Sequence, residues 1–215
     1  MVARRVSFES AVTTGRGDDG TTGLLYGGER VAKDDPRTEA YGAVDEAVAA
    51  LGLARAILVE RAAIGSLPAA LADTAGVILR IQRELFVVGA ELATNPAARD
   101  RAEDGRTRVS AAMVDGLEEL LIVSEAAIKM PREFVVPGET RVSAALELAR
   151  TIVRRAERRT VALKRSADQP SSALLAYLNR LADLLWVLAR ATEQAEDHAA
   201  MPMRQRSRHE GEEVR

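Results

Sequence analysis

The sequence contains no cysteine and only two histidines, His198 and His209, among its 215 residues. The absence of cysteine excludes disulfides, thiolate nucleophiles and thiolate metal sites. Both histidines lie in the polar C-terminal end, so an imidazole base or a histidine metal ligand would have to come from the tail. An enzyme built from this chain must work with carboxylates, arginines, amides and backbone donors.

Long apolar runs and an excess of charge of one sign are also missing. No apolar stretch approaches the roughly 20 residues that a membrane span requires, and the N-terminus lacks the apolar core of a signal peptide. We therefore expect a cytoplasmic protein with no membrane partner. The 30 basic and 32 acidic residues nearly balance, which argues against a nucleic-acid partner, because phosphate contacts usually bring a basic excess.

Glycine is concentrated near the N-terminus, where six of the 15 glycines lie between Gly15 and Gly28. Neither a P-loop nor a Rossmann fingerprint is present in this segment. Residues 1–35 are therefore predicted to form a glycine-rich arm. The arm is either flexible, or it wraps a phosphate with backbone amides and threonine hydroxyls, with Lys33 adding a positive charge.

Apolar residues recur at helical spacing after Lys33 and predict five helices. The expected helices run from Pro36 to about Gly65, from about Pro68 to Asn95, from Ser110 to Pro131, onward from about Val142, and from Ser171 to Asp197. Residues 97–108 are expected to form a surface loop, and residues 134–138 a short extended connection, since Pro137 and Gly138 oppose a helix. The prediction is an all-α fold: a five-helix up-and-down bundle over residues 36–197, of the ferritin-like kind, followed by a disordered tail over residues 198–215.

Charged residues on the predicted fourth helix suggest a binding site. Arg150, Arg154 and Glu157 share one helix face because they are spaced i, i+4, i+7. This pattern is typical either of a solvated face or of one wall of a cleft, and arginine forks suit the oxygens of a triphosphate. On the first helix, Asp45 sits beside the buried stripe, where it either pairs with a cation or lies exposed at the edge.

Six segments together resemble the PduO-type ATP:cob(I)alamin adenosyltransferases, from about Thr13 to Arg190. They are GDDGTT (17–22), GGERVAKDDPR (27–37), AYGAVDE (40–46), FVVPG (134–138), ARTIVRRAERR (149–159) and YLNRLADLLWVLAR (177–190). The sequence departs from the family where Thr14-Gly15-Arg16-Gly17 replaces the usual Thr-Lys/Arg-Thr-Gly, and where Glu139 replaces the second glycine of a Pro-Gly-Gly loop.

The resemblance implies a five-helix bundle that assembles as a homotrimer with ATP between neighbouring subunits. The implied reaction moves the 5′-deoxyadenosyl group of ATP onto the cobalt of cob(I)alamin, releasing triphosphate and forming adenosylcobalamin. Cobalt(I) is itself the nucleophile, so neither histidine nor cysteine is needed. A flavin-type reductase and an adenosylcobalamin-dependent acceptor enzyme are the implied partners.

The resemblance also implies roles for individual residues. Arg154 would stabilise charge on the leaving triphosphate, Asp45 would pair with Arg150 near the corrin, and Phe134 would press beneath the corrin and exclude its lower axial ligand. Glu157 would help to hold Mg²⁺ indirectly, and no metal is implied that the protein binds by itself. The implied ATP contacts are Thr14, Gly15, Arg16, Gly17, Thr22, Gly23, Lys33, Arg154, Arg155, Glu157, Arg158 and Asn179.

Two other classes of function fit the sequence less well. A non-catalytic cobalamin carrier or nucleotide sensor could use the same bundle. A ferritin-like metal protein would need Glu-x-x-His pairs on facing helices, and no histidine lies in a predicted helix core.

Overall fold

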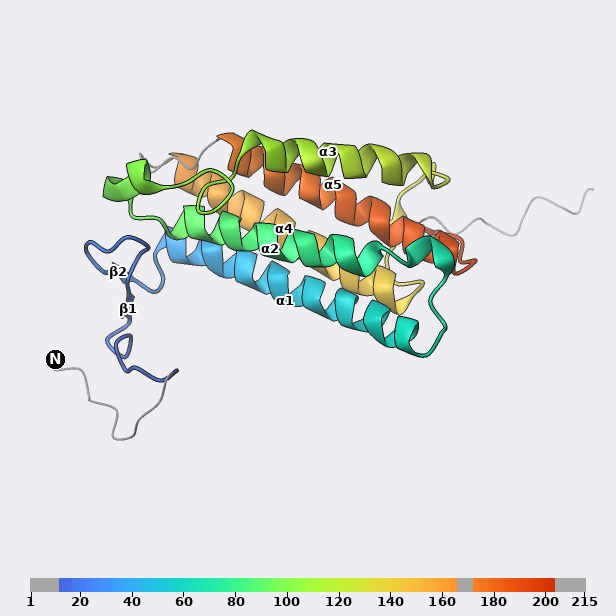
Figure 1. Ribbon diagram of the computed structural model, residues 1–215, viewed down its shortest axis with the longest axis horizontal. Helices are drawn as coiled ribbons and strands as arrows, with labels where there is room; N and C mark the ends of the chain where they lie inside the picture. Colours follow the sequence, from blue (N-terminus) through green and yellow to red (C-terminus); the bar gives the residue numbers. More distant parts are fainter. Residues whose placement is uncertain (1–11, 166–171, 204–215) are drawn as a thin grey trace, which may run out of the picture.

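The computed structural model describes residues 12–165 and 172–203, and in this part of the chain five long helices form an up-and-down bundle (Figure 1). The bundle confirms the expected fold class. The helices are α1 (Pro36–Ala63), α2 (Thr74–Ala93), α3 (Ala111–Ala126), α4 (Arg141–Arg165) and α5 (Ser172–Ala195). Two short 3₁₀ helices, Ala69–Leu71 and Pro96–Arg101, lie in the connections on either side of α2.

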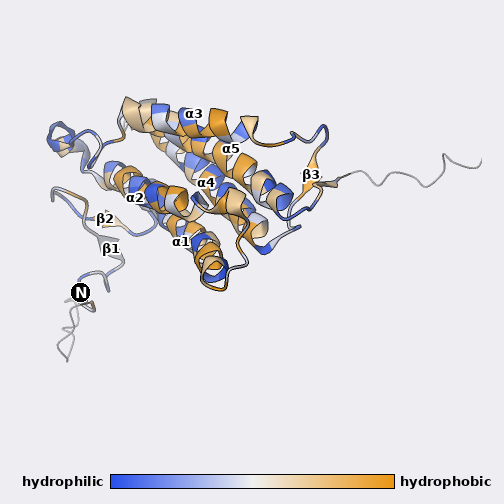
Figure 2. Ribbon diagram, turned by 45° about the vertical axis from the view of Figure 1, so that its right-hand side comes forward, coloured by the Kyte–Doolittle hydropathy of each residue, from blue (hydrophilic) through white to orange (hydrophobic). Residues whose placement is uncertain are grey.

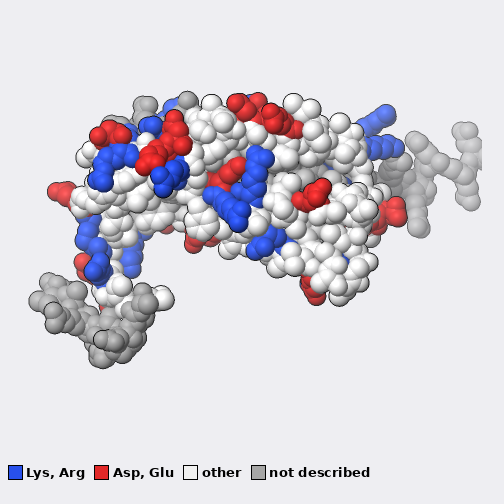
Figure 3. Space-filling model, in the orientation of Figure 1, with Lys and Arg blue, Asp and Glu red and all other residues white. Residues whose placement is uncertain are grey.

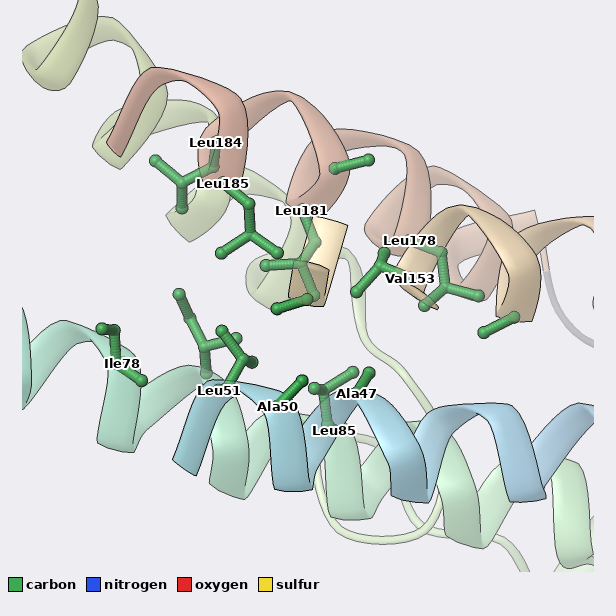
Figure 4. Close-up of a cluster of buried hydrophobic side chains, with 14 of the residues drawn as sticks. Ala47, Ala50, Leu51, Ile78, Leu85, Val153, Leu178, Leu181, Leu184 and Leu185 are labelled. Carbon is green, nitrogen blue, oxygen red and sulfur yellow. The ribbon is translucent and has the colours of Figure 1, made fainter. Parts of the chain in front are cut away.

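Helix contacts give the spatial order α2–α1–α4–α5–α3. The apolar stripes of the helices face inward (Figure 2), where Leu51, Leu85, Val153 and Leu181 are fully buried (Figure 4). Alanines on the facing sides of α1 and α4, Ala47 and Ala149 among them, are also fully buried. Because small side chains let helix axes approach closely, α1 and α4 can pack tightly against each other. α4 is third in the spatial order of the five helices and therefore lies in the middle of the bundle.

Local signals set the helix starts. The Asp35 carboxylate accepts a hydrogen bond from the Arg37 backbone N–H at 2.8 Å and begins α1, as the Asp-Asp-Pro sequence predicts. The Ser110 hydroxyl caps α3 in the same way. At α4, Thr140 and Ser143 cap each other's backbone N–H at 3.1 Å. The third helix ends at Ala126, earlier than the apolar spacing predicts.

Two short antiparallel strand pairs lie at opposite ends of the bundle (Figure 2). At one end, β1 (Thr21–Thr22) pairs with β2 (Val31–Ala32). At the other, β3 (Val135–Val136) pairs with β4 (Met201–Pro202). The prediction of a disordered tail from His198 therefore differs from the structure, because residues 201 and 202 form a strand; residues 204–215 lie outside the described residues.

None of the helices in the described ranges is both long and apolar enough to cross a bilayer.

Candidate functional site

Arg30 holds together the described part of the glycine-rich arm, residues 12–35, which is called the glycine arm below. The Arg30 guanidinium donates to the Thr21 hydroxyl at 2.7 Å, to the Arg16 carbonyl at 2.8 Å and to the Thr21 carbonyl at 2.9 Å. Thr14 joins this turn, since its hydroxyl accepts from the Arg16 N–H at 3.5 Å. The three hydrogen bonds of the Arg30 guanidinium thus join Arg16, one of the expected ATP contacts, to Thr21 on β1.

Within the arm, Lys33 lies against Gly17. A Cβ atom built on Gly17 would stand 2.9 Å from Lys33 Nζ, so the ammonium group occupies the space that the missing side chain leaves. The Lys33 N–H donates to the Gly20 carbonyl at 2.9 Å, and Thr22 lies on β1 next to this turn. The structure therefore brings Gly17, Thr22 and Lys33 together.

Asp19 stabilises the same turn. Its carboxylate accepts from the Thr21 hydroxyl at 2.7 Å and from the Thr21 N–H at 2.9 Å. These hydrogen bonds favour the ionised form and lower the pKa of Asp19 below its ordinary value.

The arm is fixed to the bundle at the end of α2. The Leu25 N–H donates to the Ala93 carbonyl at 2.8 Å, and the Asn95 side chain donates to the Gly27 carbonyl at 2.6 Å. Gly28 has a φ of +97°, and a Cβ atom there would stand 1.9 Å from Asn95 Nδ2. Only glycine fits this backbone approach.

A first pocket, the Arg154 pocket, lies on α4. Arg154, Glu157 and Arg158 line it together with Val161 and Ala162, and its volume is about 350 Å³. The Arg154 guanidinium is exposed and, among the described residues, forms no ion pair with a carboxylate. Because no carboxylate in the described part of the chain pairs with it, Arg154 is available to an anionic ligand.

Glu157 connects the Arg154 pocket to α5. The Asn179 amide donates to Glu157 Oε1 at 3.4 Å, and Arg180 donates to the Asn179 carbonyl oxygen at 2.9 Å. Glu157 thus lines the pocket with Arg154 and Arg158 and also accepts a hydrogen bond from Asn179.

Two further arginines of α4 pair with α1. Arg155 forms an ion pair with Glu46, and Arg159 with Glu39 at 3.2 Å. Arg155 is therefore turned from the Arg154 pocket toward α1 in this chain. Asp45, the neighbour of Glu46, is exposed, and its carboxylate has no hydrogen bond or ion pair among the described residues.

A second pocket, the Phe134 pocket, lies at the start of α4. Phe134, Glu147, Arg150 and Trp186 are among its lining residues, and its volume is about 510 Å³. The Phe134 side chain is 82% exposed, although it is a large apolar group. An apolar ring held in solvent beside an arginine suits a flat ligand with an apolar face and charged edges.

Arg150 is held in this pocket by Glu147 and not by Asp45. Arg150 Nε donates to Glu147 Oε2 at 2.7 Å, while the other carboxylate oxygen lies 3.4 Å from Nη1 of the buried Arg190. The expected Asp45–Arg150 pair is absent within this chain. The physical reason is that Asp45 faces solvent, whereas Glu147, one turn before Arg150 on the same helix, is within direct reach.

The arm and the Phe134 pocket lie at opposite ends of the bundle (Figure 2). Lys and Arg side chains gather on the arm that projects from one end of the bundle (Figure 3), whereas β3 and the Phe134 loop lie at the other end (Figure 2). No hydrogen bond or ion pair among the described residues joins the arm to Arg154, Glu157 or Asn179.

Sequence reasoning missed Arg30, Glu147 and Trp186. A weak signal existed for Glu147, because i, i+3 spacing from Arg150 predicts a pair on one helix. Trp186 is half-buried and lines the Phe134 pocket, with the Arg190 guanidinium 5.5 Å from its ring centre. Arg30 bonds mainly to backbone carbonyls, which leave no pattern in the sequence.

Comparisons with known proteins agree with these features. The family model described as cobalamin adenosyltransferase matches residues 12–192. The chain is 37% identical over 189 residues to the corrinoid adenosyltransferase of Citrobacter freundii, covering 88% of this chain and 98% of that protein. It is 40% identical over 180 residues to the corrinoid adenosyltransferase of Mycobacterium tuberculosis strain H37Rv, covering 83% and 86%.

A solved structure of a family member has the same fold as this chain. A variant of the PduO-type ATP:corrinoid adenosyltransferase from Lactobacillus reuteri, complexed with cobalamin and ATP, matches with a TM-score of 0.77 and 30% identity, covering 90% of this chain and 96% of that one. In sequence and in structure, the chain belongs to the cobalamin adenosyltransferase family of enzymes.

Proposed function

We propose that this protein transfers the 5′-deoxyadenosyl group of ATP to the cobalt of cob(I)alamin and releases triphosphate. The observation that carries this proposal is the adjacency of the two pockets on α4. Arg150 lines the Phe134 pocket and Arg154 lines the Arg154 pocket, and four residues along a helix correspond to a rise of about 6 Å. A corrin and a nucleotide bound in the two pockets would therefore be neighbours.

In the reaction, the electron pair of cobalt(I) forms the bond to C5′ of ATP while the C5′–O bond breaks. The leaving triphosphate takes the electron pair of that bond and gains charge. Arg154 would stabilise this charge, because its guanidinium is exposed on the pocket and pairs with none of the acids that the structure describes. Arg158 supplies a second cation in the same pocket.

The Phe134 pocket would bind the corrin. Phe134 would lie under the corrin ring and exclude the lower axial ligand, so that cob(II)alamin becomes four-coordinate and easier to reduce to cobalt(I). A flavin-type reductase would supply the electron, and an adenosylcobalamin-dependent enzyme would receive the product. We place the reaction in the cytoplasm.

A homotrimer would complete the nucleotide site. The arm carries Thr14, Gly15, Arg16, Gly17, Thr22, Gly23 and Lys33, and among the described residues no hydrogen bond or ion pair joins these seven to Arg154, Glu157 or Asn179. We propose that the arm of one subunit closes the Arg154 pocket of its neighbour, with ATP between them. In the same assembly, the exposed Asp45 would reach Arg150 of a neighbouring subunit.

Mg²⁺ fits this site as a companion of ATP. The ion usually takes one or two protein carboxylates and completes its shell with phosphate oxygens and water. Glu157 is the carboxylate of the Arg154 pocket, and its Oε1 also accepts from Asn179. When bound, the ion would neutralise triphosphate charge, and Glu157 would orient its waters.

An anaerobic assay with ATP and chemically reduced cob(I)alamin tests the proposal. We expect stoichiometric adenosylcobalamin, identified by its light-sensitive cobalt–carbon bond, and triphosphate rather than pyrophosphate plus phosphate. Tight binding of both ligands without a cobalt–carbon product would instead identify a carrier or sensor.

A further inference from the structure

The loop that carries Phe134 is hydrogen-bonded to the C-terminal end of the described chain. At the start of the loop, the Gln194 side chain of α5 accepts from the Lys129 N–H at 2.9 Å and donates to the Lys129 carbonyl at 2.8 Å. This pair of bonds ties the loop to the last turn of α5.

Beyond α5, residues 201–203 bind the loop a second time. β4 pairs with β3 in the register Val135 to Pro202 and Val136 to Met201. The ladder continues by one residue, since the Met203 N–H donates to the Phe134 carbonyl at 2.8 Å. Phe134 itself is therefore the residue whose backbone the C-terminal segment holds.

The position of the Phe134 ring depends on this backbone. The side chain is 82% exposed, so packing within the chain does little to fix it. On the far side of the loop, Gly138 adopts a φ of +120° and Thr140 begins the cap of α4. Between these two ends, the backbone of the loop is hydrogen-bonded to residues 201–203, and these bonds fix its position.

We propose that Gln194 and residues 201–203 are positioning residues. They hold the Phe134 backbone where the Phe134 ring can lie beneath the corrin. This inference rests on the proposed function, in which Phe134 displaces the lower axial ligand. A pair of two-residue strands is marginal by itself, so losing one of its hydrogen bonds should release the loop. Release would impair the reaction that starts from cob(II)alamin and would spare the reaction of cob(I)alamin, which needs no ligand displacement.

Met203→Pro tests the tether directly, because proline has no N–H to donate to Phe134 and its φ suits an extended strand. Met203→Ala is the matched control, since it removes the side chain and keeps the N–H. We expect Met203→Pro to lower the rate from cob(II)alamin plus reductant by about fivefold, as for one lost hydrogen bond. The fraction of four-coordinate cob(II)alamin, measured by electron paramagnetic resonance, should fall with it. Met203→Ala should match wild type in both measurements.

A double variant with Phe134→Ala shows whether the tether acts through Phe134. If it does, adding Met203→Pro to Phe134→Ala lowers the rate no further. Gln194→Glu supplies a second test at the other anchor, because it keeps the Oε1 acceptor and loses the donor to Lys129. It should shift the four-coordinate fraction in the same direction as Met203→Pro.

The outcomes separate this inference from the proposed function. If Phe134→Ala leaves the cob(II)alamin reaction intact, the displacement role of Phe134 in the proposed function is wrong. If Phe134→Ala impairs that reaction but Met203→Pro behaves like Met203→Ala, only the tether is overturned. A further loss when Met203→Pro is added to Phe134→Ala would also overturn it.

Discussion

Glu147 joins Arg150 of the Phe134 pocket to the buried Arg190. One carboxylate oxygen accepts from Arg150 at 2.7 Å and the other lies 3.4 Å from Arg190, which also pairs with Glu193 at 2.8 Å. Arg190 has no exposed surface, and a buried cation is stable only when it is paired. The fold thus uses Glu147 both to neutralise Arg190 and to aim Arg150.

Glu147→Gln should therefore destabilise the protein. The substitution keeps the shape of the side chain and removes one of the two negative charges around Arg190, so we expect a loss of about 1–3 kcal/mol in the free energy of unfolding. Urea unfolding at neutral pH measures it. Glu139→Gln, on an acid outside this network, is the control, and equal stabilities of the two variants would show that Glu147 does not neutralise Arg190.

Asp45 and Arg150 should be coupled in activity if the trimer brings them together. In a double-mutant cycle with Asp45→Asn and Arg150→Ala, each single variant should weaken corrin binding or turnover, and the double variant should be little worse than the poorer single. Neighbouring Glu46→Gln is the control for Asp45. Strictly additive effects would mean that Asp45 and Arg150 never meet.

How much of this could be predicted from the sequence depended on how local the interactions are. The helices and the Asp35 cap follow from periodicity and from neighbours within one turn. The pairing of β4 with β3 joins segments far apart in the chain, and such pairing leaves no local signal. Asp45 follows the buried Val44, and the sequence left open whether its carboxylate is paired or exposed, because helix spacing puts it at the edge of the apolar stripe. The structure shows Asp45 exposed.

Arg154→Ala should lower kcat more than it weakens ATP binding. A donor that acts mainly on developing triphosphate charge is worth about 10²-fold in kcat. Steady-state kinetics with pre-formed cob(I)alamin, together with direct ATP binding, separates the two effects. Arg154→Lys, which keeps the charge but loses the fork, should fall between wild type and Arg154→Ala. An equal loss of ATP affinity with unchanged kcat would show that Arg154 only anchors ATP.

Tyr177 should make stability depend on pH at the alkaline end. Burial raises the pKa of Tyr177 well above the ordinary value, and so does the nearby charge of Glu84, which accepts a hydrogen bond from the Tyr177 hydroxyl at 2.8 Å. The contribution of Tyr177 to the free energy of unfolding is therefore full below about pH 10, the ordinary tyrosine pKa. Above that pH the unfolded chain ionises while the folded chain keeps its proton, so stability falls toward the raised folded-state pKa. Tyr177→Phe should flatten this part of the stability profile, and an unchanged profile would contradict the assignment.

In the proposed trimer, each working site takes its glycine arm from one subunit and its Arg154 pocket from another. Mixing and reassembling Lys33→Ala with Arg154→Ala subunits tests this arrangement, since each variant alone lacks one half of every site. In random mixed trimers of equal proportion, the arrangement predicts that about a quarter of the sites regain both intact halves. Activity should therefore return to about a quarter of wild type on mixing. Activity that stays at the level of the two separate variants would contradict a shared site.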